Sequence, residues 1–162
     1  MTNVLVLRFS SMGDVAMTVP VLRCLVKNYP NSKITIVSKG IYRPIFIEFG
    51  NIHFFELDLQ GRHKGFKGLL SLFKELKKLR PTHIADLHSV LRSNVLYFLF
   101  KINFFKIKRL NKQRGERKKL FRSKNKIFKP LTSSQFRYCE VFNRLGFNLD
   151  LTSHEFPGPL NI

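Results

Sequence analysis

A short polar segment, Ser10-Ser11-Met12-Gly13-Asp14, follows an apolar run near the start of the chain and carries the residues best suited to chemistry. Its two hydroxyls can bind a sugar or a phosphate, and its glycine allows a positive φ or a close approach of the backbone to a ligand. Asp14 can act as a general base that takes a proton from a sugar hydroxyl, or it can serve as an ordinary helix N-cap. The spacing matches neither a Walker A loop nor a Gly-x-Gly-x-x-Gly fingerprint, which disfavours the nucleotide-binding folds of those two classes.

Further polar side chains occur later in the chain. Arg62 and Lys64 lie in a glycine-flanked loop, and His88 and Arg92 follow an apolar segment. His88 and Arg92 can bind an anionic acceptor, or they can form an ordinary polar turn and a surface cation at a helix start. His83, at the beginning of an expected strand, is interpreted as structural. Because no His, Cys, Asp and Glu residues show metal-ligand spacing, we expect no metal site.

The net charge of +19 is concentrated in two segments of the 162-residue chain. Residues 62–80 contain seven basic residues and one acidic residue, and residues 101–129 contain thirteen basic residues and one acidic residue. A local cationic surface indicates an anionic partner such as nucleic acid, a phosphorylated glycan or membrane headgroups. Two solvated basic faces are the alternative interpretation.

Length and composition exclude several classes of protein. The chain is 44% hydrophobic with 17 Phe residues, which is too apolar for a disordered chain and enough for one domain with a core. Cys24 and Cys139 cannot build a disulfide scaffold, and we expect both to be buried on apolar helical faces. The chain starts without the charged region of a secretory signal, so we expect a cytoplasmic protein. Its longest apolar run, residues 95–100, is far shorter than the roughly 18–20 residues of a transmembrane helix.

Short apolar strands alternate with helical patterns along the chain. Strands are predicted at residues 3–9, 33–38, 52–57, 82–87 and 104–110, and helices at residues 14–28, 41–49, 66–80, 90–100 and 133–145. The first helix contains Pro20, so it either kinks there or begins near Thr18. The periodicity predicts that Phe66 and Phe136 pack inward, and residues 111–129 are expected to form a loop or marginal helix. This alternation predicts an α/β fold with a Rossmann-like, doubly wound, mostly parallel sheet.

The segment VLVLRFSSMGDVAMTVPVLRCLVKNYPNSKITIVS resembles the opening of the glycosyltransferase family 9 heptosyltransferases. Its features are an apolar strand, Ser-Ser-x-Gly-Asp, Thr-x-Pro, and a Leu before Tyr-Pro. Three later segments agree in order, namely GRHKG, ADLHSVLRS and QFRYCEVFNRLGF, so the resemblance covers about residues 3–147. It implies one half of a GT-B enzyme, in which two Rossmann-like domains face each other across a cleft. Residues 1–147 would form the N-terminal acceptor-side domain and residues 148–162 a linker-like tail, with the C-terminal donor domain absent.

The resemblance also implies roles for the candidate residues. Asp14 matches the catalytic base, and Ser11 and Gly13, with Ser10 beside them, match the loop that approaches the donor. The basic loop and Arg137 match acceptor-binding positions, and Ser133 stands where the family frequently has His. The full set expected to bind the acceptor is Arg62, Lys64, His88, Arg92 and Arg137.

The function implied by the resemblance is transfer of heptose from ADP-heptose to an anionic acceptor of the lipopolysaccharide core, of the lipid A–Kdo type. No cofactor is implied beyond this nucleotide-sugar substrate, and the enzyme would lie peripherally on the inner, anionic face of the cytoplasmic membrane. One alternative is a nucleic-acid-binding module, because basic and apolar residues interleave over residues 109–129. No helix-turn-helix, zinc-finger or RNP-type motif supports it, so no specific nucleic acid is expected. An inactive, truncated half-enzyme is the other alternative.

Overall fold

A five-stranded parallel sheet forms the centre of the molecule. The computed structural model describes residues 2–111 and 132–152, so the loop or marginal helix expected at residues 111–129 lies almost entirely outside the described residues. The strands are β1 (Asn3–Leu7), β2 (Lys33–Ser38), β3 (Ile52–Glu56), β4 (His83–Asp86) and β5 (Lys106–Arg109). Their order in the sheet is β3-β2-β1-β4-β5. The five predicted strands are confirmed, the second with the predicted ends and the other four with slightly different ends.

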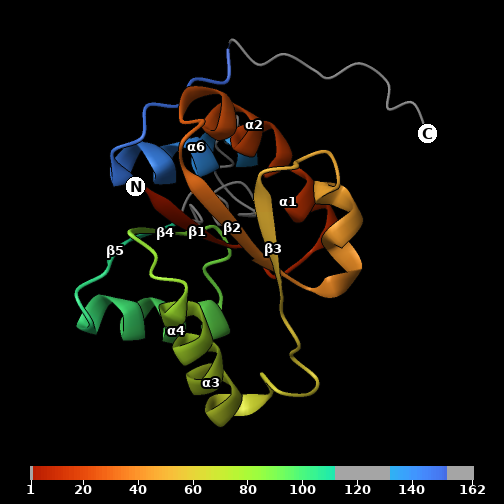
Figure 1. The fold of residues 1–162 in the computed structure, drawn as a ribbon, viewed down its shortest axis with the longest axis vertical. Helices are drawn as coiled ribbons and strands as arrows, with labels where there is room; N and C mark the ends of the chain where they lie inside the picture. The colour runs from red at the N-terminus through yellow and green to blue at the C-terminus, as the bar shows by residue number, and fades with distance from the viewer. Residues whose placement is uncertain (1, 112–131, 153–162) are drawn as a thin grey trace, which may run out of the picture.

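Helices cover both faces of this sheet (Figure 1). On one face lie α1 (Met12–Ala16), α2 (Val19–Asn28) and α6 (Ser134–Leu145); on the other lie α3 (Gly65–Lys78) and α4 (Leu91–Ile102). Side chains alternate along a strand, so Val4 and Val6 of β1 pack with the first set while Leu5 and Leu7 pack with the second. The predicted doubly wound α/β fold is therefore confirmed.

The helix expected at residues 14–28 is two helices. α1 ends at Ala16, and α2 begins at Val19 with Thr18 as its N-cap. Pro20 lies in the first turn of α2, where its missing N–H removes no intrahelical hydrogen bond. The interpretation that the regular helix begins near Thr18 is therefore correct. The helix expected at residues 41–49 is a 3₁₀ helix, η1 (Gly40–Phe46).

Two aromatic residues expected in the core are exposed instead. Phe66 is 65% exposed and Phe136 is 53% exposed. At about 100° per residue, the buried residues of α3 centre on a side about 100° from Phe66, and those of α6 on a side almost opposite Phe136. The periodicity therefore assigned the wrong environment to both. Both cysteines are buried, as predicted.

α6 ends as its sequence predicts, and the chain stays packed beyond it. Gly146 adopts a φ of 101°, the left-handed conformation that terminates many helices at glycine. Leu149 is 4% exposed and lies in the same core cluster as α2 and α6, so the packed domain extends at least to this residue. Within residues 2–111 and 132–152, each helix is too short or too polar to cross a bilayer.

Candidate active site at the switch point of the sheet

The strand order reverses beside β1, and this position is where ligands bind in open α/β sheets. β1 pairs with β2 on one side and with β4 on the other, and Leu7 pairs with Asp86 at the carboxyl ends of β1 and β4. The polar segment after β1 and the segment after β4 therefore share one edge. Asp14 follows the end of β1 and His88 follows the end of β4, so two residues that the sequence analysis placed in separate motifs lie at the same edge.

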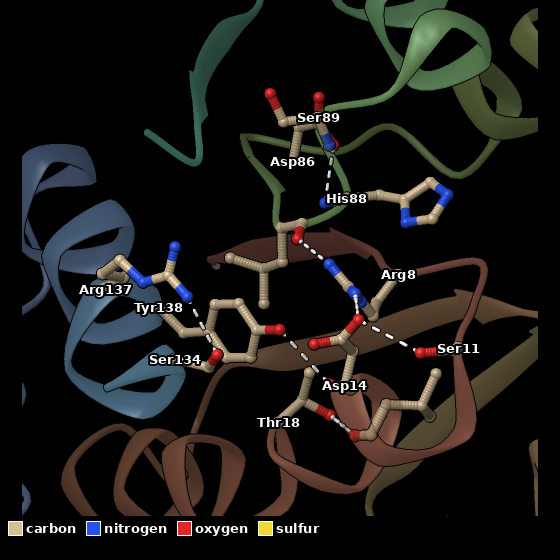
Figure 2. A network of polar contacts seen from close by, with 12 residues as sticks. Arg8, Ser11, Asp14, Thr18, Asp86, His88, Ser89, Ser134, Arg137 and Tyr138 are labelled. Atoms are coloured by element: carbon tan, nitrogen blue, oxygen red, sulfur yellow. Dashed lines mark hydrogen bonds and ion pairs between the residues drawn. The ribbon is translucent and has the colours of Figure 1, made fainter. Parts of the chain in front are cut away.

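Arg8 joins the two segments, and the sequence patterns did not select it. It is 5% exposed, its Nη1 donates a hydrogen bond to the Leu87 carbonyl at 2.5 Å, and its Nη2 forms an ion pair with the Asp14 carboxylate. Its guanidinium carbon lies 5.8 Å from the ring centroid of Tyr138. Figure 2 shows Arg8 between the end of β4 and Asp14. A cation inside the otherwise apolar residues 4–9 was the available signal, because a buried charge requires a partner.

Asp14 lies inside α1, so the N-cap interpretation is wrong. The N-cap residue is Ser11, and the Asp14 side chain accepts a hydrogen bond from the Ser11 hydroxyl at 3.2 Å. The Asp14 side chain is 44% exposed, whereas the Arg8 side chain with which it pairs is 6% exposed. A buried cation on one side thus orients a carboxylate whose other side remains accessible to a ligand.

The backbone conformation at position 13 does not require glycine. The backbone of Gly13 is helical within α1 and this residue is absent from the positive-φ residues of the described chain, so the expectation of a positive φ is wrong. No atom lies within 4 Å of the position that a Cβ would take. The open space above Gly13 agrees with the second expectation, a close approach by a ligand. Beside it, Ser11 is exposed and Ser10 is half-buried.

α6 closes the side of the site next to Asp14. The hydroxyl of Tyr138 donates to the Asp14 backbone carbonyl at 3.3 Å, and burial raises the pKa of Tyr138, so this group remains a donor. Arg137 is 7% exposed; its Nη2 donates to the Ser134 hydroxyl at 3.0 Å, and its buried Nε has no hydrogen-bond partner among the described residues. Ser133 is the N-cap of α6 and accepts a backbone N–H with its side chain.

His88 and Arg92 follow β4, as predicted, but in different environments. His88 is 8% exposed and packs on Phe9 with ring centroids 5.0 Å apart. The Asp86 carboxylate accepts the backbone N–H groups of His88 at 3.0 Å and Ser89 at 2.9 Å, which holds the turn into α4. In Figure 2 the His88 imidazole lies on the other side of Arg8 from Asp14. Arg92 is exposed in the first turn of α4.

A cavity of about 540 Å³ opens at the carboxyl ends of β2 and β3 and includes Arg92. Its lining residues are Lys39, Ile41, Glu56, Leu57, Asp58, Leu59, Gln60 and Arg92. A larger hollow of about 870 Å³ lies at the opposite edge of the sheet, around residues 28–33, and contains none of the predicted site residues. Among the described residues, no group of three or more His, Cys, Asp or Glu side chains is placed to hold a metal ion.

The basic loop is built around His63, a second residue that the sequence analysis did not select. His63 is 1% exposed, its Nδ1 accepts the backbone N–H of Asp58 at 3.1 Å, and its Nε2 lies 3.3 Å from Oε1 of Glu75 on α3. A Cβ on Gly68 would stand 2.3 Å from the backbone carbonyl carbon of His63, so only glycine allows α3 to pack this closely. Glu75 also lies 3.6 Å from the guanidinium of Arg62. The contacts of His63 and Arg62 with Glu75, and the close packing at Gly68, therefore hold the loop against α3.

Asp58 fixes the backbone of the same loop. Its carboxylate accepts the N–H groups of Gly61 at 2.7 Å and of Gln60 and Arg62 at 3.1 Å each. The hydrogen bond from Gly61, followed by that from Arg62, holds the pKa of Asp58 below its ordinary value. Arg62 and Lys64 are both exposed, but neither lines the cavity. The loop follows β3, which is two strand spacings, about 10 Å, from β1.

Solved structures share this fold. The glycosyl transferase family 9 protein of Veillonella parvula superposes with a TM-score of 0.66 at 24% identity, over 94% of this chain and 43% of that one. The E. coli heptosyltransferase WaaC with ADP superposes with a TM-score of 0.65 at 18% identity, over 95% of this chain and 50% of that one. The chain has the fold of glycosyltransferase family 9. The resemblance predicted from the first motif is thereby confirmed.

Sequence comparison finds a protein named as a heptosyltransferase as well. The lipopolysaccharide core heptosyltransferase OpsX of Haemophilus influenzae is 27% identical over 99 residues, which are 61% of this chain and 28% of OpsX. No family model matches the chain. The chain thus spans about half, or less, of the length of each relative that it matches.

Proposed function

We propose that this chain is the acceptor-side half of a glycosyltransferase that transfers heptose from ADP-heptose to an anionic sugar of the lipopolysaccharide core. The observation that carries the proposal is Asp14, held by buried Arg8 at the switch point of a family 9 fold. Two similar proteins are named heptosyltransferases, and WaaC has been solved with ADP and with ADP-2-deoxy-2-fluoro heptose, which supports the donor class. The acceptor-side domain would include the packed residues at least as far as Leu149 instead of ending at residue 147, and a link to the donor domain would begin after them.

In this proposal Asp14 is the general base. Its carboxylate takes the proton of the attacking acceptor hydroxyl, the freed oxygen bonds to the anomeric carbon of heptose, and the bond to the diphosphate breaks so that ADP leaves. Arg8 and the Ser11 hydroxyl hold the carboxylate in position. The exposed backbone at Gly13 leaves room for the donor to approach.

The exposed cations at this edge would supply the charge that an anionic acceptor requires. Lys64 and Arg92 are exposed, and Arg62 is exposed although its Nη2 also donates to the Glu56 carbonyl at 3.3 Å. A spacing of about 10 Å between β3 and β1 suits an acceptor of more than one sugar, with its anionic groups at the basic loop and its hydroxyl at Asp14. The lipid part of such an acceptor would place the enzyme peripherally at the inner face of the cytoplasmic membrane.

Binding of a Kdo-bearing core acceptor tests this arrangement. The Lys64→Gln and Arg92→Gln variants should each bind it more weakly than the parent chain, with unfolding midpoints unchanged because both side chains are exposed. Lys33→Gln is the matched control, since Lys33 is exposed at the amino end of β2, on the opposite edge. Arg62→Gln should weaken binding and also loosen the loop, because Arg62 contacts Glu56 and Glu75. Equal binding by Lys64→Gln, Arg92→Gln and Lys33→Gln would contradict the acceptor assignment.

A further inference from the structure

The outward side of α4 is apolar although it faces solvent. Leu91, Phe98 and Ile102 are 81%, 55% and 70% exposed, and at about 100° per residue their positions fall within about 40° of one another around the helix. The opposite side of α4 is buried through Ser93, Leu96 and Phe100. A helix that is apolar on both sides is normally covered on both sides. Among the described residues α4 is covered on one side only, with α3 beside it (Figure 1).

Phe104 is a further exposed apolar residue just beyond the end of α4. It is 97% exposed and has a φ of 61°, a left-handed conformation in which a bulky residue is rare. Its N–H bonds the Lys101 carbonyl at 3.1 Å and the next N–H, of Phe105, bonds the Phe100 carbonyl at 3.1 Å. This is the hydrogen-bond pattern of a helix end at which glycine is usual. The chain therefore keeps a large ring, held out in water, where glycine would be less strained.

The surroundings of the stripe are basic. Residues 87–111 contain five basic residues, all exposed, and no acidic residue; they are Arg92, Lys101, Lys106, Lys108 and Arg109. From the neighbouring helix α3, Lys77 reaches the end of α4 and lies 3.3 Å from the side-chain oxygen of Asn103. Side chains alternate along β5, so Lys106 and Lys108 point to the α6 side, where Lys106 Nζ lies 3.1 Å from His83 Nε2, whereas Arg109 lies over the ring of Tyr97 in α4. The cations beside the stripe are therefore Lys77, Arg92, Lys101 and Arg109. We call the stripe of Leu91, Phe98 and Ile102, with Phe104 beyond it and these four cations beside it, the α4 face.

We propose that the α4 face docks on an anionic lipid bilayer, with Phe98, Ile102 and Phe104 at the boundary between headgroups and acyl chains. Exposed aromatic and aliphatic side chains next to cations, without acids, match the chemistry of that boundary. A second copy of the chain is a poor occupant, because pairing two such faces would bring their cations together in a protein of charge +19. The proposal deepens the membrane association proposed above, and it rests on that function only for the lipid-linked nature of the acceptor.

The placement of the α4 face also suits a lipid-linked acceptor. α4 begins beside the cavity that Arg92 lines and runs for 12 residues, about 18 Å, toward the opposite edge of the sheet. Phe98, Ile102 and Phe104 lie toward this far end, away from Asp14. Docking through these three residues leaves the switch-point edge of the sheet accessible to ligands. Arg92, at the border of that edge, stays next to the bilayer.

Tryptophan fluorescence tests the orientation, because the chain contains no native Trp. Phe98→Trp should show a blue-shifted emission with vesicles of phosphatidylcholine containing phosphatidylglycerol, and a smaller shift with phosphatidylcholine alone. Ile47→Trp is the matched control, since Ile47 is 78% exposed outside the α4 face and its emission should not shift. An unshifted emission from Phe98→Trp on vesicles that bind the chain would show attraction by charge without docking of this face, and would overturn the proposal.

Vesicle sedimentation of variants without an added tryptophan measures how strongly the α4 face binds the bilayer. The double variant Ile102→Gln, Phe104→Gln should partition to anionic vesicles at least about tenfold more weakly than the parent chain, while Ile47→Gln should partition as the parent does. Phe104→Gly should weaken binding yet raise the unfolding temperature, because glycine relieves the left-handed position. If Phe104 had only a structural role, Phe104→Gly would not weaken vesicle binding while raising the unfolding temperature.

Three results would reject the α4 face as a bilayer surface. They are unchanged vesicle binding by the double variant, dimerisation of the parent chain that the double variant abolishes, and displacement from vesicles by single-stranded RNA that binds the same face. Transfer to a lipid-free core oligosaccharide depends on Asp14 and on the acceptor cations, Arg92 among them, and not on the apolar stripe. Loss of that transfer would therefore count against the proposed function, whereas loss of vesicle binding alone would count against the docking surface.

Discussion

The ion pair between Arg8 and Asp14 should couple the two residues energetically. Removing either charge alone, with Arg8→Met or Asp14→Asn, and then both together gives a double-mutant cycle. The two side chains differ strongly in exposure, at 6% for Arg8 and 44% for Asp14. Arg8 also donates to the buried carbonyl of Leu87, a contact that does not involve Asp14.

These features set the magnitude. Two unit charges in contact attract by about 4 kcal/mol at an effective dielectric constant of about 20, before desolvation is counted. Exposed pairs contribute about 0–1 kcal/mol, and breaking a fully buried pair costs about 3–5 kcal/mol. A pair with one buried and one half-exposed partner should therefore show a coupling of about 1–2 kcal/mol. Arg8→Met also leaves the Leu87 carbonyl without its donor, which adds about 1–2 kcal/mol.

Urea unfolding followed by circular dichroism at neutral pH measures the four free energies of unfolding. Asp14→Asn should lower the free energy by about 1–2 kcal/mol and Arg8→Met by about 2–4 kcal/mol, with the double variant close to Arg8→Met alone. Substitution effects that add to within about 0.5 kcal/mol would refute the reasoning, because independent residues behave in that way.

Three further predictions concern the basic loop and the core. Asp58→Ala should speed hydrogen exchange at the three amides that its carboxylate accepts; because the folded pKa of Asp58 lies below its ordinary 3.8, its stabilising effect should be present above that pH and vanish as the pH falls through the folded pKa, so a difference between parent and variant that persists in stronger acid would count against it. Burial raises the pKa of Cys139 to about 12, so this thiol should resist iodoacetamide at pH 8 in the native chain and react in urea; rapid native labelling would disagree. Gly68→Ala should destabilise the chain by about 2 kcal/mol or more because the added Cβ meets the backbone of His63, whereas Gly50→Ala, where no atom lies within 4 Å, should change little; equal effects would contradict the close packing.

The sheet and most helices could be predicted because their signals are local. Apolar runs ended by turn residues mark the five strands, and Gly146 marks the end of α6. The wrong burial predictions arose where burial depends on which side of a helix packs on the sheet. The spacing assigned Phe66 and Phe136 to apolar faces, yet the sides of α3 and α6 that are buried are turned away from these two residues, so their rings are exposed.

The candidate site was predictable in part. The position of Asp14 after the first strand was sufficient to place it at the ligand-binding edge. Arg8 was missed because its partners come from distant parts of the chain, with the Leu87 carbonyl 79 residues away. His63 was missed for a similar reason, since only the packing of α3 shows that this loop residue is buried.

Heptose transfer by the Asp14→Asn variant tests the central claim most directly. The chain, supplied with a family 9 donor domain, would be mixed with ADP-heptose and a lipid-free core acceptor, and the product measured by mass spectrometry. The account predicts that the parent transfers heptose and that Asp14→Asn, still folded by circular dichroism, transfers it at least about a hundredfold more slowly. Near-normal transfer by folded Asp14→Asn would contradict the assignment of Asp14 as the base and leave its carboxylate only a partner of Arg8.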